Sequence, residues 1–149
     1  MSNTQTIPLH SPHLLFQHSE IWKLACLDGG VEVKRWKRKE IPGVTPIWEG
    51  LYMWNVYAYV NKSHPLFEQI KAGYPYLHCV ADFPMHKGAN YVEPLYSPTA
   101  ATELVGYKVG CDYNYVEDEW LTHISTPQAA ESVFRDALRL RDWMDEVAK

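Results

Sequence analysis

Two short segments of this 149-residue chain hold the polar side chains best suited to chemistry. They are His86-Lys87-Gly88-Ala89-Asn90-Tyr91 and Gly110-Cys111-Asp112, and both adjoin stretches typical of strands. An imidazole can transfer a proton near neutral pH, a lysine can bind an anion, and Gly88 lets a ligand approach the backbone. The same residues also fit a solvated turn, and an aspartate at a strand end often only caps a turn.

These residue types support an enzymatic hypothesis. His86 would act as general acid or base, Asp112 would orient it, and Lys87 would stabilise an anionic transition state on a phosphate or acyl substrate. The chain contains no Gly-x-Ser-x-Gly, P-loop or His-Glu-x-x-His motif. The reaction type of a small hydrolase or transferase therefore stays open.

A basic segment forms a second candidate site. Lys34-Arg35-Trp36-Lys37-Arg38-Lys39 concentrates five of the fourteen Lys and Arg residues around one tryptophan. In a strand, alternation places Trp36 on the same face as Lys34 and Arg38, with Arg35 on the other face. A tryptophan flanked by cations can stack on a base while the charges hold phosphate. The alternative is a solvated edge strand whose charges block edge-to-edge association.

Composition restricts the class of protein. The length fits a single domain over residues 1–149, and the formal charge of −4 argues against general nucleic-acid binding. The three cysteines are far apart and include no Cys-x-x-Cys pair, which argues against a disulfide framework and a structural zinc site and indicates a reducing, cytoplasmic compartment. We expect no signal peptide and no membrane span.

The elements that must position these residues follow from local patterns. Residues 1–13 predict an N-terminal arm without regular structure, and 41–46 a loop. Residues 21–27 and 31–36 predict a hairpin whose turn, Asp28-Gly29-Gly30, uses the glycines for positive φ. A helix over residues 14–27 is the competing interpretation, because the apolar residues there do not alternate cleanly.

The rest of the chain predicts a sheet packed by helices. Residues 51–60, aromatic and β-branched on both faces, predict a central strand. Further strands are expected at 76–80, 90–92 and 104–113, and a short helix near 64–72.

Residues 126–148 predict a long amphipathic helix that begins at Ser125-Thr126-Pro127-Gln128. Its apolar face is expected to hold Ala130, Val133, Phe134, Ala137, Leu138, Met144 and Val147, and Glu131–Arg135 and Arg141–Asp145 are expected to pair on its solvated side. The fold class is therefore α+β, with an antiparallel or mixed sheet.

In the order of its motifs the chain resembles a family of small, uncharacterised bacteriophage proteins whose members read Gly-Tyr-Val, Gly-His-Pro, His-Gly-Gly-Leu-Thr-Tyr and Gly-Phe-Asp-Cys-Ala-His. The matching segments, within residues 52–118, are Tyr57-Ala58-Tyr59-Val60, His64-Pro65-Leu66-Phe67, His86-Lys87-Gly88-Ala89-Asn90-Tyr91 and Gly110-Cys111-Asp112. This match places His64 at the expected cleft, although the residue on its own also suits the start of a helix. Asp112-Tyr113-Asn114-Tyr115 lacks the family's cysteine and second histidine, so the resemblance implies no metal centre here.

These observations favour a binding protein over an enzyme. The leading hypothesis is a phage-encoded protein of the host cytoplasm, without cofactor, that sequesters a small anionic or nucleotide-type ligand, or a host factor, to counter host defence. A protein–protein interaction module, possible also as a homo-oligomer, is the third hypothesis, since aromatic-rich surfaces serve interfaces equally well. The candidate ligand-binding residues are His86, Lys87, Gly88, Tyr91, Asp112, His64, Trp36, Arg35 and Arg38.

Overall fold

The computed structural model describes residues 2–6, 16–40, 42–43 and 50–149, which form an α+β domain. Its antiparallel sheet has six strands in the order β1-β2-β3-β4-β6-β5. The strands are β1 (Ser2–Thr6), β2 (Phe16–Cys26), β3 (Gly29–Arg38), β4 (Tyr52–Asn61), β5 (Tyr91–Tyr96) and β6 (Leu104–Asp112). The helices are α1 (Leu66–Gly73), α2 (Glu131–Ala148) and the 3-10 helices η1 (Leu77–Val80) and η2 (Val116–His123).

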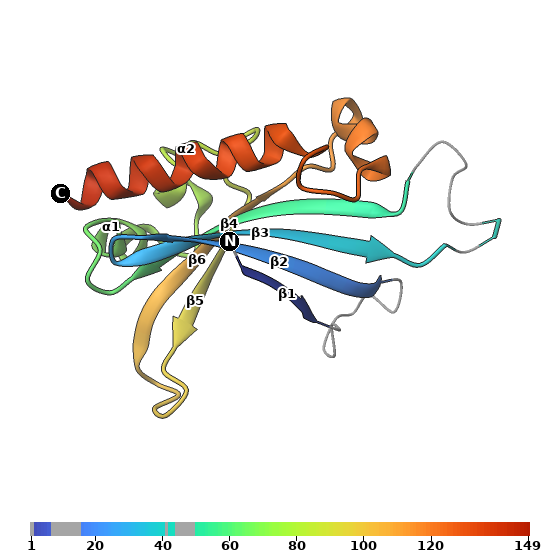
Figure 1. Cartoon of the computed structure of the whole chain (residues 1–149). Coiled ribbons are helices and arrows are strands. Elements are labelled where there is room, and N and C mark those ends of the chain that lie inside the picture. The colour runs from blue at the N-terminus through green and yellow to red at the C-terminus, as the bar shows by residue number, and fades with distance from the viewer. Residues whose placement is uncertain (1, 7–15, 41, 44–49) are drawn as a thin grey trace.

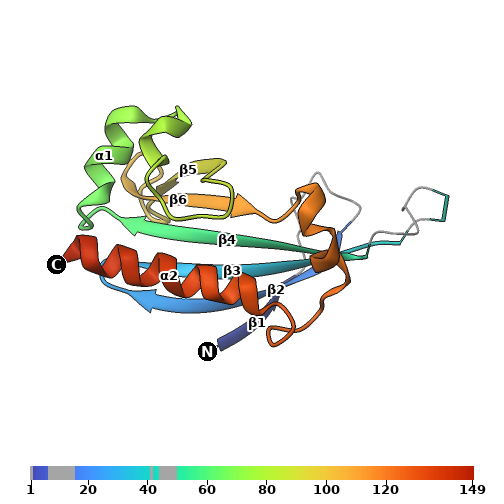
Figure 2. The ribbon, with the colours of Figure 1, turned by 90° about the horizontal axis from the view of Figure 1, so that it is seen from above.

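The helices cover one face of the sheet and leave the other open. Helix α2 runs across β2, β3 and β4 (Figures 1 and 2). Helix α1 packs beside it on the same face, because Phe67 contacts Tyr107 of β6 with ring centroids 5.4 Å apart. In the part of the chain that the structure describes, no helix lies on the opposite face, which we call the open face.

Strand alternation builds the core between sheet and helix. Val33, Val56 and Val109 lie in neighbouring strands and are fully buried. Burial of each such side chain contributes about 1.5–3 kcal/mol. Trp22 and Trp54 add a stacked pair 5.7 Å apart, and Phe134 of α2 meets both rings edge-on.

The hairpin of β2 and β3 confirms the expected strands but not the expected turn. The two strands are joined by Leu27 and Asp28, and Asp28 takes the positive φ of 53°. Gly29 serves a different purpose, since a Cβ there would lie 2.2 Å from the carbonyl oxygen of Tyr59. The alternative helix over 14–27 is wrong from residue 16 onward, and residues 14 and 15 lie outside the described residues.

Three other expectations need correction or restriction. Residues 2–6 of the expected arm form strand β1, paired with β2, while 7–13 lie outside the described residues. Of the loop expected at 41–46, only Pro42 and Gly43 are described, and they form a turn. Residues 76–80 hold the 3-10 helix η1 instead of a strand, because the exposed residues 76–78 precede two buried ones and do not alternate.

The C-terminal helix is confirmed, with a later start. Thr126 closes a turn, accepting from the backbone N–H of Ala129 and of Ala130, and α2 begins at Glu131. Its buried face includes Leu140, whereas Leu138 is 41% exposed. The expected partner of Arg141 also differs: Arg141 pairs with Asp142, and Asp145 accepts from Leu27 N–H at 2.7 Å, which fixes the β2–β3 turn to α2.

Candidate functional site

His86 lies against the end of β6 and bonds to a buried carboxylate. Its ring stacks on Tyr113, with centroids 4.4 Å apart and planes 12° apart. Its Nε2 lies 2.8 Å from Oδ2 of Asp118, whose side chain is 6% exposed. The same oxygen accepts from the backbone N–H of Tyr115 at 3.2 Å. Since Asp118 belongs to η2, these bonds join the 3-10 helix to the His86 segment.

Tyr113 extends this network to α2. Its hydroxyl donates to Oδ2 of Asp136 at 2.7 Å. Burial raises the pKa of the Tyr113 phenol far above its ordinary value, so it stays a neutral donor. Burial likewise raises the pKa of the Cys111 thiol to about 12, although the backbone of His86 contacts it. Neither group therefore supplies an ionised nucleophile near neutral pH.

Asp112, the expected partner of His86, lies on the opposite face of the sheet. Its neighbours Cys111 and Tyr113 are buried on the α2 side, so strand alternation turns Asp112 to the open face. There its Oδ2 accepts from Nδ2 of Asn90 at 3.0 Å. The histidine of the expected pair thus has a different carboxylate, and that carboxylate lies in a 3-10 helix that no sequence pattern predicted.

Lys87 forms a second link to η2. Its Nζ lies 2.6 Å from a carboxylate oxygen of Glu117 and 5.9 Å from the ring centroid of Tyr115. The hydrogen bond with Glu117 raises the pKa of Lys87 and lowers the pKa of Glu117. Lys87 has a φ of 59° and Gly88 a φ of 86°, so two consecutive residues are left-handed. The side chains of Lys87 and Glu117 are both solvated. Because Lys87 is paired with Glu117, its charge is not available to a ligand.

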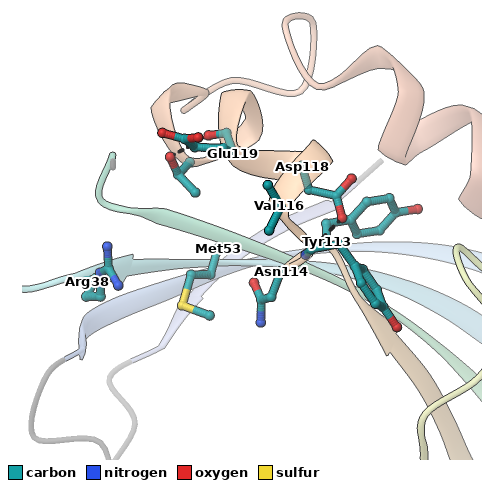
Figure 3. Close-up of a pocket in the computed structure, with 9 residues that line it drawn as sticks. Arg38, Met53, Tyr113, Asn114, Val116, Asp118 and Glu119 are labelled. Atoms are coloured by element: carbon teal, nitrogen blue, oxygen red, sulfur yellow. Dashed lines mark hydrogen bonds between the residues drawn. The ribbon is translucent and has the colours of Figure 1, made fainter. Parts of the chain in front are cut away.

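A pocket of about 330 Å³ lies beside this network, between the sheet and η2. Arg38 and Met53 lie at one end, and Tyr113 and Asp118 at the other (Figure 3). Arg38 donates to the carbonyl oxygen of Gly50 at 3.1 Å. The pocket is lined by Arg38, Met53, Tyr113, Asn114, Tyr115, Val116, Asp118, Glu119 and Thr122. With two carboxylates against one guanidinium, its charge does not favour an anion.

Two candidate residues have structural positions on the helix side of the sheet. Arg35 is buried, bonded to Glu20 at 2.6 Å and to the carbonyl of Ser125. His64 is also buried, and its two ring nitrogens contact the carbonyl oxygen of Met144 at 3.0 Å and the N–H of Leu66 at 3.1 Å. Both side chains hold elements together, so neither is available to a ligand on the open face.

The open face of the sheet carries polar and aromatic side chains in ordered rows. Strand pairing aligns residues of β3, β4, β6 and β5 side by side, with Cβ atoms of direct neighbours about 4.5–5.5 Å apart. The rows are Lys34-Asn55-Asp112, then Glu32-Tyr57-Gly110-Tyr91, then Tyr59-Lys108-Glu93. Trp36 lies two residues beyond Lys34, and of the candidate residues it shares this face with Tyr91 and Asp112.

Two lysines of this face, Lys34 and Lys108, sit over aromatic rings. Nζ of Lys108 lies 4.2 Å from the ring centroid of Tyr57 and 5.6 Å from that of Tyr59. Nζ of Lys34 lies 4.0 Å from the ring centroid of Trp36. Across residues 16–40 and 50–149, neither ammonium group forms an ion pair. The two charges are thus held in place by rings and are not neutralised by a carboxylate.

Two carboxylates of this face, Glu32 and Glu93, accept hydrogen bonds from tyrosine hydroxyls. Glu32 is buried and accepts from the hydroxyl of Tyr59 at 3.3 Å, and Glu93 accepts from the hydroxyl of Tyr91. Burial and the neighbouring Lys108 lower the pKa of Lys34 despite the attraction of Glu32. The surroundings of Lys34 therefore disfavour its positive charge. An anion bound beside Lys34 would stabilise that charge.

Sequence reasoning missed four residues of this face: Asn55, Tyr57, Tyr59 and Lys108. The alternation of Asn55, Tyr57 and Tyr59 with buried small residues was a usable signal. Alternation within the expected strand also placed Lys108 on the face of Asp112, but only the strand register brings it beside Tyr59.

No group of three or more His, Cys, Asp or Glu side chains suited to a metal ion occurs among the described residues. None of the helices within these ranges is long and apolar enough to cross a membrane. No protein family, curated protein or solved structure matches this chain.

Proposed function

We propose that the protein binds a small anionic, nucleotide-type ligand on the open face and releases it unchanged. The observation that carries this proposal is the pair Lys34 and Lys108, two cations on an uncovered sheet face with no ion-pair partner within the described ranges. A phosphate group binds lysine through charge-assisted hydrogen bonds. The proposal rests on these two local positive charges, since Glu32, Glu93 and Asp112 lie on the same face and the whole chain has a net charge of −4.

Aromatic side chains supply the second part of the binding energy. Tyr57 lies over Gly110, where a Cβ would come within 2.5 Å of the tyrosine ring, so the glycine lets this ring lie close to the sheet. Tyr91 meets Tyr57 edge-on, with centroids 6.0 Å apart. Stacking of a base on an aromatic side chain contributes about 1–3 kcal/mol. A ligand with a base and a phosphate would use both features of the face.

Calorimetry with a panel of linear and cyclic nucleotides tests this proposal. Lys108→Ala and Lys34→Ala should each weaken binding about tenfold or more, because a hydrogen bond to a charged group contributes about 1.5–3 kcal/mol. Lys71→Ala in α1, an exposed lysine on the covered side of the molecule, is the matched control and should leave the affinity unchanged. Flat traces for every nucleotide would contradict the proposal.

The resemblance to bacteriophage proteins supports the further proposal that binding sequesters a host signal and so counters host defence. In that case the ligand should be recovered intact after the wild-type protein is denatured. Conversion of the nucleotide during incubation would instead favour an enzyme.

A hydrolase or transferase is the second candidate, and the bond between His86 and Asp118 favours it. With Nε2 donating to the carboxylate, the neutral ring keeps Nδ1 as its basic atom, and Asp118 would orient the imidazole. Asp118 takes the place that Asp112 held in the sequence-based hypothesis. Nucleotide turnover that is present in the wild type and absent in His86→Ala would establish this activity, whereas equal rates would exclude His86.

A further inference from the structure

A hollow on the open face adjoins Lys34 and Lys108. It has a volume of about 270 Å³ and lies over β4, β5 and β6. Its lining residues are Asn55, Tyr57, Asn90, Tyr91, Cys111 and Asp112. We infer that this hollow is a base subsite that selects guanine over the other bases. The inference rests on the proposed function, because it names the part of the nucleotide that the lysines do not hold.

Asp112 gives the hollow two free acceptor positions. Its Oδ2 accepts from Nδ2 of Asn90 at 3.0 Å, and its Oδ1 accepts from the backbone N–H of Asn114 at 3.2 Å. A carboxylate has about four lone-pair sites, so each oxygen can accept one more hydrogen bond. The two existing bonds also fix the orientation of the carboxylate before a ligand arrives.

Asn90 adds a third acceptor. Its backbone N–H donates to the carbonyl oxygen of Gly110 at 2.9 Å, which holds the residue against β6. Because its Nδ2 donates to Asp112, the remaining polar atom of its amide is the acceptor Oδ1. Beside the amide donors of Asn55 and Asn90, the hollow thus presents the Asp112 carboxylate and Asn90 Oδ1 as acceptors, which suit a ligand edge made of donors.

Guanine alone among the common bases presents two adjacent donors on one edge, a ring N–H and an amino group. A carboxylate accepts both in a bidentate arrangement. Adenine and cytosine place a ring acceptor beside their amino group, and uracil places carbonyls on both sides of its N–H. Each of these bases would direct at least one lone pair at the Asp112 carboxylate. A site whose polar groups are left unpaired in this way rejects the wrong partner strongly.

The register connects this subsite with the lysines. Asn55 is the cross-strand neighbour of both Lys34 and Asp112, so these two residues lie two strand spacings apart, about 10 Å. The edge-on pair of Tyr57 and Tyr91 borders the hollow and offers ring surface to a base. A nucleotide whose base meets Asp112 can thus extend its phosphate along the same face toward the two cations.

The experiment compares guanosine, adenosine, inosine and xanthosine monophosphates by calorimetry on wild-type protein and Asp112→Asn. Guanosine monophosphate should bind wild type about tenfold or more tightly than adenosine monophosphate, and inosine monophosphate, which lacks the amino group, should fall between them. Asp112→Asn should reverse the preference toward xanthosine monophosphate, since xanthine has a carbonyl where guanine has the amino group. Asp142→Asn on the exposed side of α2 is the matched control and should keep the wild-type order.

Each other outcome would overturn the inference in a distinguishable way. Equal affinity for the four nucleotides, or an unchanged preference in a folded Asp112→Asn protein, would overturn the base subsite and leave the anion-binding function standing. Absence of binding by all four, together with flat traces for inorganic phosphate, would overturn both. Circular dichroism of Asp112→Asn establishes that the variant is folded.

Discussion

Lys87 adopts a backbone conformation that favours glycine, and its side chain pairs with Glu117 of η2. Its φ of 59° lies in the left-handed region, which costs a non-glycine residue about 1–2 kcal/mol. The bond with Glu117 and the bonds of its neighbour His86 join the segment to η2.

Lys87→Gly and Lys87→Ala should separate backbone strain from the ion pair. Both variants lose the ammonium group, so their difference isolates the backbone, and the glycine variant should be more stable by about 1 kcal/mol. Urea denaturation followed by tryptophan fluorescence measures the two free energies of unfolding. The same pair of substitutions at Lys71, inside α1, is the control and should give the opposite order, since glycine in a helix costs about 1 kcal/mol relative to alanine.

The residues of the candidate site were only partly predictable. His86 and Asp112 were identified because their residue types suit chemistry. Their expected contact does not form, because strand alternation places Asp112 on one face of the sheet and Tyr113, which stacks on His86, on the other. The register that aligns Lys34, Asn55 and Asp112 depends on pairing between distant strands. No spacing within one segment encodes such pairing, because each strand alone is compatible with several registers.

At the scale of elements, α2 shows how far a helical pattern can be interpreted from sequence. Its existence follows from apolar spacing, and its burial face from the 3.6-residue period. The helix begins later than predicted, because Thr126 closes a separate turn that precedes it. The predicted apolar face included Leu138 and omitted Leu140, although residues 133, 137, 140 and 144 follow the period more closely and are fully buried.

Leucine truncation on α2 should distinguish the two faces. Leu140→Ala removes a fully buried side chain and should destabilise the protein by about 2–5 kcal/mol. Leu138→Ala, the control two residues earlier, changes a side chain that is 41% exposed and should shift stability by no more than about 0.5 kcal/mol. Chemical denaturation of both variants gives the two values. Similar losses would show that the helix is rotated about its axis from the orientation described.

At the scale of the whole molecule, raised pKa values of thiols and phenols make the fold sensitive to alkali. Burial raises the pKa of Cys26 to about 11 and of Cys111 to about 12, and burial with the Glu93 hydrogen bond raises that of Tyr91 to about 12. Tyr57 and Tyr59 are shifted further upward, mainly by burial. Each of these acids keeps its proton in the folded protein at a pH where the unfolded chain has lost it.

The free energy of unfolding should therefore fall as pH rises. The stabilising contribution is fully present below about pH 9, the ordinary value of a thiol, and is lost as the pH passes through about 11 to 12. Lys34 acts in the opposite direction, because its pKa is lowered and its burial becomes less costly as it loses its proton. The thiols and phenols with raised pKa values outnumber Lys34, so the net free energy of unfolding still falls as pH rises. Urea denaturation at about pH 8, 10 and 11 measures the trend, and a flat or rising profile would contradict it.

The contact between Tyr57 and Gly110 restricts how these two positions can change during evolution. The ring occupies the space that a side chain at position 110 would need, with a Cβ only 2.5 Å from it. In any descendant of this chain, a larger residue at 110 is compatible with the face only if the aromatic at 57 becomes smaller in the same lineage. Covariation of these two positions would then mark relatives whose overall sequences have diverged beyond ordinary similarity.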